Sequence, residues 1–106
     1  MATEKNIMET AKDTKKVLQY VIVRTSCAGV HAGELVSRNR NEVELCNARR
    51  VWAWTGAKTL HEISLFGVGD GSKISAAVAR IVLLGVIEII DATTDARAAL
   101  ETVGWN

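Results

Sequence analysis

One run of residues limits the possible folds more than any other feature. Val17–Val23 is apolar at both alternating sets of positions, which is typical of a strand that is covered on both of its faces. The chain has 106 residues, of which 48% are hydrophobic and 24% charged, and this is the composition of one small globular domain. We therefore expect a single domain over residues 17–106. One face of the strand packs against the core of that domain. Its other face is covered either by the rest of the same domain or by another subunit.

Shorter segments later in the chain also favour β-structure. In Glu42–Cys46 the apolar residues Val43 and Leu45 alternate with glutamates, which predicts that the apolar pair faces inward. Ala76–Arg80 fits a helix or a strand equally well. The further strands that we expect are Glu34–Ser37, Glu42–Cys46, Arg49–Trp54, Ile81–Leu84 and Val86–Ile90.

Turn-forming residues separate these segments. Thr25–Gly33 is rich in small residues and contains two glycines, which predicts a loop or a bend whose backbone makes a close approach. Polar turns are expected at Arg38–Asn41 and at Asn47, and a longer loop at Val68–Ser72.

Two segments predict short helices. Thr59 and Glu62 have the spacing of a capping box, so we expect a helix over residues 59–66 that ends at Gly67. A last helix is expected over Ala92–Val103, with its N-cap at one of two positions, Asp91 or Thr93. The predicted fold class is α+β: a small antiparallel β-barrel or meander with one short helix and a C-terminal helix.

The charge balance excludes some classes of function. With 13 Lys+Arg and 12 Asp+Glu the formal net charge is +1, so a non-specific nucleic-acid binder is disfavoured. Residues 1–16 carry charges of both signs, and we expect a flexible arm there rather than a signal peptide. No apolar stretch has the length of a membrane span. These patterns predict a cytoplasmic protein.

The residues that could perform chemistry do not form a known catalytic or metal-binding pattern. Cys27 and His31 are close in sequence, but neither Cys-x-x-Cys nor His-x-x-x-His spacing is present. Ser26 or Cys27 with His31 and Glu34 would supply a nucleophile, a base and an orienting group, although no motif fixes such a geometry. We expect no enzyme activity, no metal and no cofactor. Both cysteines are expected to be free thiols.

The most informative segment is Arg49–Trp54, where paired arginines precede two of the three tryptophans. Guanidinium groups pair with phosphates and indoles stack on bases, so the segment is a candidate binding surface, which the glycine-rich loop could complete. Alternatively, both tryptophans pack on a neighbouring helix or subunit. The candidate ligand-binding residues are Arg24, Ala28, Gly29, His31, Gly33, Arg49, Arg50, Trp52 and Trp54.

Two motifs resemble a family of small uncharacterised proteins of tailed bacteriophages. They are Arg24-Thr25-x-x-Ala28-Gly29-Val30-His31-Ala32-Gly33 and Arg49-Arg50-x-Trp52-x-Trp54-x-Gly56-Ala57, and the resemblance covers residues 17–105. It implies a phage accessory protein in the cytoplasm of an infected bacterial host. The strand pattern from Gly33 to Ala48 is also similar to that of SH3-like and Sm-like barrels, and this likeness concerns the fold alone.

These observations favour a binding protein over an enzyme. The first hypothesis is a homo-oligomeric counter-defence protein that sequesters a nucleotide signal of the host immune system. The second is a module that inhibits a host protein through its tryptophan face. Binding of single-stranded nucleic acid is a third and less favoured hypothesis because of the balanced charge.

Overall fold

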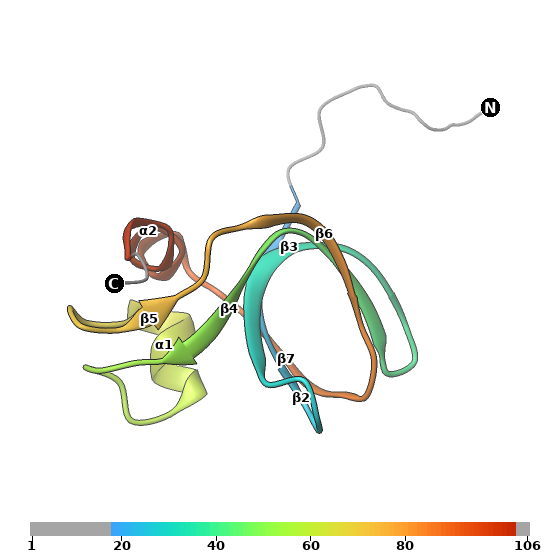
Figure 1. The fold of residues 1–106 in the computed structure, drawn as a ribbon, viewed down its shortest axis with the longest axis horizontal. Coiled ribbons are helices and arrows are strands. Elements are labelled where there is room, and N and C mark those ends of the chain that lie inside the picture. Colours follow the sequence, from blue (N-terminus) through green and yellow to red (C-terminus); the bar gives the residue numbers. More distant parts are fainter. Residues whose placement is uncertain (1–17, 104–106) are drawn as a thin grey trace.

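A computed structural model describes residues 18–103, and the predicted arm at residues 1–16 lies outside that range. Figure 1 shows a curved sheet with both helices packed on one side of it. The elements are β2 (Tyr20–Thr25), β3 (Val30–Asn39), β4 (Glu42–Ala53), α1 (Leu60–Phe66), β5 (Lys73–Ile74), β6 (Val78–Leu83), β7 (Val86–Asp91) and α2 (Thr94–Thr102).

The six strands form one sheet in the order β5-β4-β3-β2-β7, and β6 pairs with β4 beside β5. All of its ladders are antiparallel. The sheet curls so far that the tip of the β3–β4 hairpin meets the start of β7, where Val86 N donates to Asn41 O at 2.9 Å. Within the described residues no ladder joins β6 to β7. The α+β architecture is therefore confirmed, whereas the ladders do not establish a closed barrel.

The curled sheet separates two hydrophobic cores. The first contains Tyr20 and Ile22 and lies between the sheet and the two helices. The second contains Val21 and Val23 and lies inside the curl. Strand β2 thus contributes to both cores through its alternating residues, and Val21, Ile22 and Val23 are each 0% exposed. The two-sided cover expected for this strand comes from the rest of the same chain.

One half of the predicted capping box forms at the start of α1, and the return bond from Glu62 goes to the residue before the N-cap. The Thr59 hydroxyl accepts from Glu62 N at 3.3 Å, and the Glu62 carboxylate accepts from Lys58 N. The helix ends at Gly67, whose φ of 82° suits glycine better than a residue with a side chain. Of the two N-caps considered for the last helix, Thr93 is the one used, and α2 is shorter than expected at both ends.

Two predicted boundaries in the first half of the chain are wrong. The loop expected over Thr25–Gly33 is shorter, because Val30–Gly33 already belong to β3. Gly33 supports a close approach here: a Cβ on it would lie 3.0 Å from Ala48 Cα. At Asn47 the chain does not turn but continues as one strand, β4. Asn47 adopts a φ of 50°, and two β4 residues stand opposite Gly33, which is a β-bulge.

Other boundaries shift by a few residues. The polar turn predicted at 38–41 contains only Arg40 and Asn41, because β3 extends to Asn39. Val78–Arg80, which fitted a helix or a strand, belongs to β6. The two-residue strand β5 has no signal of its own in the sequence, and it exists because it pairs with the end of β4.

Thr93 should be a stabilising contact between the two helices. Its hydroxyl accepts from Ala96 N at 3.0 Å and donates to Leu65 O at 2.7 Å, so it caps α2 and holds the end of α1. We expect Thr93→Ala to lower the free energy of unfolding by about 1–2 kcal/mol in urea titrations. Thr94→Ala, at the exposed first position of α2, is the matched control and should change it much less. Equal losses in the two variants would contradict this role.

Candidate functional site

A hollow of about 330 Å³ lies between the β2–β3 loop and the end of β4. A volume near 300 Å³ is at the lower end of the range for small-molecule sites. Two segments that are about twenty residues apart in the sequence form its walls. We call it the arginine–tryptophan hollow, and its lining residues are Cys27, Ala28, Gly29, Val30, Arg50, Val51, Trp52 and Trp54.

The β2–β3 loop is held in one conformation by the buried Thr25. Its hydroxyl accepts from Ala28 N at 2.7 Å and donates to Gly29 O at 2.9 Å. Gly29 has a φ of 83°, a conformation that a residue with a side chain rarely adopts. The hollow therefore has a preformed backbone wall.

Arg50 connects the two walls of the hollow. Its Nη2 donates to Ala28 O, and its backbone N donates to Ser75 Oγ at 2.8 Å. A guanidinium has five N–H donors, and within residues 18–103 the others of Arg50 make neither an ion pair nor a further hydrogen bond. An exposed cation at the rim of the hollow is thus available to an anionic ligand.

The two tryptophans of β4 contribute differently. Trp52 is 61% exposed, so one side of its indole can be reached from solvent. Trp54 is half-buried and packs against the first core. Trp52 therefore offers a stacking surface, whereas Trp54 forms a more rigid wall. Of the alternative in which both tryptophans pack on a neighbouring helix or subunit, packing of Trp52 against another subunit stays a prediction.

A second hollow of about 350 Å³ adjoins the first, because Val30 and Trp54 line both. Arg24 belongs to its wall and is paired with Glu88 at 2.9 Å. Lys58 and His61, from the start of α1, add cationic and polar groups. We call it the Lys58 hollow, and its lining residues are Arg24, Val30, Trp54, Lys58, Thr59, Leu60, His61 and Glu88.

Three of the predicted site residues lie away from both hollows. His31 is 3% exposed, and Gly33 is buried against Ala48. Arg49 and Arg50 are neighbours on a strand and point to opposite faces of the sheet. Arg49 Nη1 donates to Ser75 O at 3.3 Å. The structure thus brings together Arg50, both tryptophans, Ala28 and Gly29, and places Arg24 in the adjoining hollow. His31 lies opposite Arg50 in the β3–β4 ladder but is buried, whereas Gly33 and Arg49 belong to neither hollow.

A family model described as Domain of unknown function (DUF6948) matches residues 18–100. The chain belongs to this family. The expectation of membership in a family of unknown function is thereby confirmed. No curated protein and no solved structure matches the chain. The matched region contains every residue of the two hollows, so the candidate site lies inside the family's domain.

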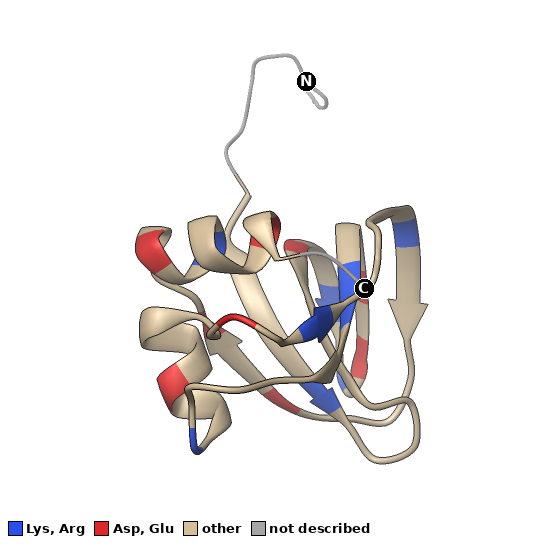
Figure 2. Cartoon of the chain, turned by 60° about the vertical axis from the view of Figure 1, so that its left-hand side comes forward, with Lys and Arg blue, Asp and Glu red and all other residues tan. Residues whose placement is uncertain are grey.

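Acidic and basic positions are interspersed over the strands and helices of this family member (Figure 2). Within residues 18–103, no three His, Cys, Asp or Glu side chains are grouped so that they could hold a metal ion. Cys27 and Cys46 are both free thiols. No helix in this part of the chain is long and apolar enough to cross a membrane. The local concentration of arginine and tryptophan remains the distinctive chemical feature of the surface.

Sequence reasoning missed the Lys58 hollow. Lys58 and His61 belong to the segment that leads into α1, and nothing in the sequence places that segment beside Arg24. The placement of Arg49 and Arg50 on opposite faces, by contrast, could have been predicted from the sequence, because adjacent residues of a strand point in opposite directions.

His31 should make stability depend on pH. Burial, and secondly the nearby positive charge of Arg50, lower the pKa of its imidazole below the ordinary value. The unfolded chain therefore binds the proton more tightly, so this contribution is complete above about pH 6.5 and decreases as the pH falls through that value. We expect the free energy of unfolding to fall between pH 8 and pH 5.5, by at most about 1.4 kcal/mol per pH unit for one proton.

The two histidines provide a matched pair for this test. His31→Gln should flatten the pH dependence in urea titrations, whereas the variant of the exposed His61, His61→Gln, should keep it. Because the slope rather than the absolute stability is compared, a general destabilisation by the substitution does not affect the outcome. A wild-type slope in His31→Gln would show that the origin lies elsewhere.

Proposed function

We propose that the arginine–tryptophan hollow binds a small nucleotide. The observation that carries this proposal is the position of one guanidinium, one exposed indole and a preformed backbone loop around the same hollow. Arg50 would pair with a phosphate, since its charge is present at every physiological pH. Trp52 would stack on the base, and the loop from Cys27 to Val30 would approach the ligand closely.

The size and charge of the site favour a small ligand over an extended nucleic acid. Each hollow has the volume of a small-molecule site rather than of a long channel. The net charge of the whole chain is +1, which gives little long-range attraction for a polyanion. One phosphate-binding arginine beside a stacking surface is sufficient for a nucleotide.

The role we propose is sequestration without turnover. The resemblance of the two sequence motifs to a family of tailed-phage proteins supports a phage accessory protein acting in the cytoplasm of the infected host. A nucleotide bound there by a non-enzymatic protein is withdrawn from its receptor. The ligand would then be a signal of the host immune system, and the protein a counter-defence factor. This proposal assigns no catalytic residue and no cofactor.

A second candidate function is inhibition of a host protein through the same surface. The observation that favours it is the 61% exposure of Trp52, because exposed tryptophan and arginine are enriched among residues that dominate binding energy in protein interfaces. A host protein that copurifies with the wild-type chain and with Arg49→Ala, but not with Trp52→Lys, would support this candidate.

The nucleotide proposal predicts a different response for two adjacent arginines. Cyclic dinucleotides, cyclic oligonucleotides and ADP-ribose compounds are titrated by calorimetry, and binding of at least one is expected with a Kd below about 100 μM, about −5.5 kcal/mol. Arg50→Ala should then weaken binding about 10- to 100-fold, since a charged hydrogen bond contributes roughly 1.5–3 kcal/mol. Arg49→Ala, on the opposite face, is the control and should bind as the wild type does.

Two further variants separate the contributions at this site. Arg50→Lys keeps the charge and should bind between the wild type and Arg50→Ala. Trp52→Phe should weaken binding moderately and Trp52→Ala more, since stacking on a base contributes about 1–3 kcal/mol. Failure of the whole panel to bind, or an unchanged affinity in Arg50→Ala and Trp52→Ala, would contradict the nucleotide proposal.

A further inference from the structure

The outer edges of β6 and β7 are the two longer open edges of the curled sheet, which also has the two-residue strand β5 at an edge. Strand β6 pairs only with β4, and β7 pairs only with β2, among the strands that the structure describes. Each strand has six residues. An open edge presents a row of unpaired N–H and C=O groups to any strand of suitable length. The molecule thus has two such edges that can accept another strand, although Val86 N at the start of β7 already donates to Asn41 O.

These edges lack two of the features by which proteins usually prevent edge-to-edge pairing, although β7 has a register shift at Ile87, the residue without a partner on β2. The chain contains no proline, and neither strand contains a lysine. Arg80 on β6 and Glu88 on β7 are engaged in ion pairs with Glu44 and Arg24 within the domain. The charged side chains on these two strands are therefore mostly directed to neighbours on the same sheet.

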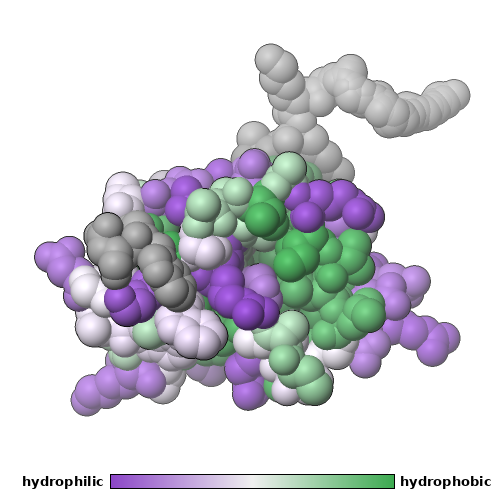
Figure 3. Space-filling view, viewed as in Figure 1, coloured by the Kyte–Doolittle hydropathy of each residue, from purple (hydrophilic) through white to green (hydrophobic). Residues whose placement is uncertain are grey.

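Exposed apolar side chains are concentrated on the same two strands. Of the eight large hydrophobic residues that are exposed in the described part of the chain, four lie between residues 78 and 87. Figure 3 shows a continuous apolar patch over the part of the molecule where β6 runs. The four residues are Val78, Val82, Leu84 and Ile87. An apolar surface along an open edge is suited to burial against another strand.

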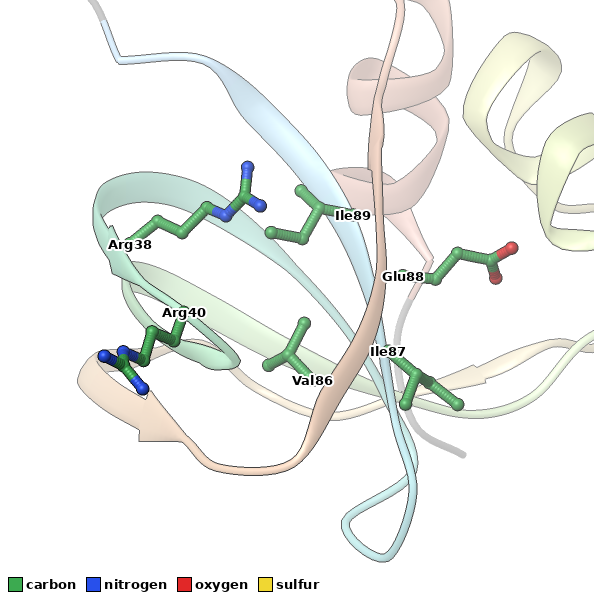
Figure 4. Close-up of a pocket in the computed structure, with 6 residues that line it drawn as sticks. All are labelled: Arg38, Arg40, Val86, Ile87, Glu88 and Ile89. Carbon is green, nitrogen blue, oxygen red and sulfur yellow. The ribbon is translucent and has the colours of Figure 1, made fainter.

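The flanks of the two edges differ in charge. Beside β7 a hollow of about 190 Å³ is lined by Arg38 and Arg40 together with Val86–Ile89 (Figure 4). Beside β6 another hollow of about 290 Å³ has Glu42, Glu44 and Arg80 as its charged lining residues, and Arg80 is paired with Glu44. Within residues 18–103, Arg38, Arg40 and Glu42 have no ion-pair partner. The flank of β7 is thus basic, and the flank of β6 has an unpaired acidic group.

We propose that a second copy of this chain covers these edges, with β6 of one copy pairing with β7 of the next. This arrangement brings the Glu42 flank of one copy toward the Arg38 and Arg40 flank of the other, whereas β7-to-β7 pairing brings like charges together. A head-to-tail contact of this kind is heterologous and gives a ring if its rotation closes and an open filament if it does not, whereas two such contacts between the same two copies give a symmetric dimer. The proposal is independent of the nucleotide site, since no residue of the arginine–tryptophan hollow belongs to either edge.

The test is the mass of the full chain in solution by light scattering after size exclusion at about 100 μM. The wild type is expected at a multiple of 11.5 kDa. Val82→Lys and Ile87→Lys should each be monomeric, because a charge is introduced on one of the two edges. Val36→Lys is the matched control: Val36 is 43% exposed and Val82 42%, but Val36 lies on the inner strand β3. This control should keep the wild-type mass.

Mixing the two monomeric variants distinguishes head-to-tail pairing from all others. Val82→Lys keeps an intact β7 edge and Ile87→Lys an intact β6 edge, so an equimolar mixture should form a species of twice 11.5 kDa. Pairing of β6 with β6 would instead leave Ile87→Lys associated on its own and the mixture without a new dimer. Amide hydrogen exchange of the wild-type chain tests the same contact without any substitution. The protection of the backbone amides at residues 78–91 should rise with protein concentration.

Three outcomes would overturn the proposal. They are a wild-type mass of 11.5 kDa at this concentration, an unchanged mass in Val82→Lys or Ile87→Lys, and a mixture that remains monomeric. Circular dichroism of each variant shows that it is folded. If one variant fails to fold, concentration-independent exchange at residues 78–91 of the wild type overturns the proposal equally.

Discussion

Strand β2 can be buried on both faces only if the rest of this short chain folds back over it twice, and the main features of the molecule follow from that requirement. The helices cover the side with Tyr20 and Ile22, and the curled sheet covers the side with Val21 and Val23. A flat sheet of these strands would leave the second set exposed. The curl brings the tip of the β3–β4 hairpin to the start of β7 and leaves β6 and β7 as separate edges.

The candidate site lies where β2 leaves the interior. The loop that follows it is fixed by Thr25, the last residue of β2, which remains buried. Arg50 then reaches this loop from β4 and holds its Ala28 carbonyl. The rigidity of the hollow therefore derives from the cores, and the chemistry derives from the side chains on its rim. A preformed site of this kind loses little conformational entropy when a ligand binds.

The sequence predicted those features that depend on nearby residues. The N-cap at Thr59 and the alternation around Val43 and Leu45 are local signals, and both predictions are confirmed. The extent of β3 was missed because the role of Gly33 depends on Ala48, fifteen residues further along the chain. The turn predicted at Asn47 is wrong because an asparagine with positive φ fits a tight turn and a bulge equally well.

The bulge at Asn47 also determines which β4 residues face which core. Before it, the odd-numbered Val43 and Leu45 belong to the second core; after it, the even-numbered Ala48 does, and the odd-numbered Val51 belongs to the first. If β4 ran through Asn47 as a regular strand without the bulge, the faces of everything that follows would be reversed, and Arg49 and Arg50 would exchange positions. Residues that readily adopt the positive φ of position 47 should consequently be favoured there during the evolution of this family, and β-branched residues disfavoured.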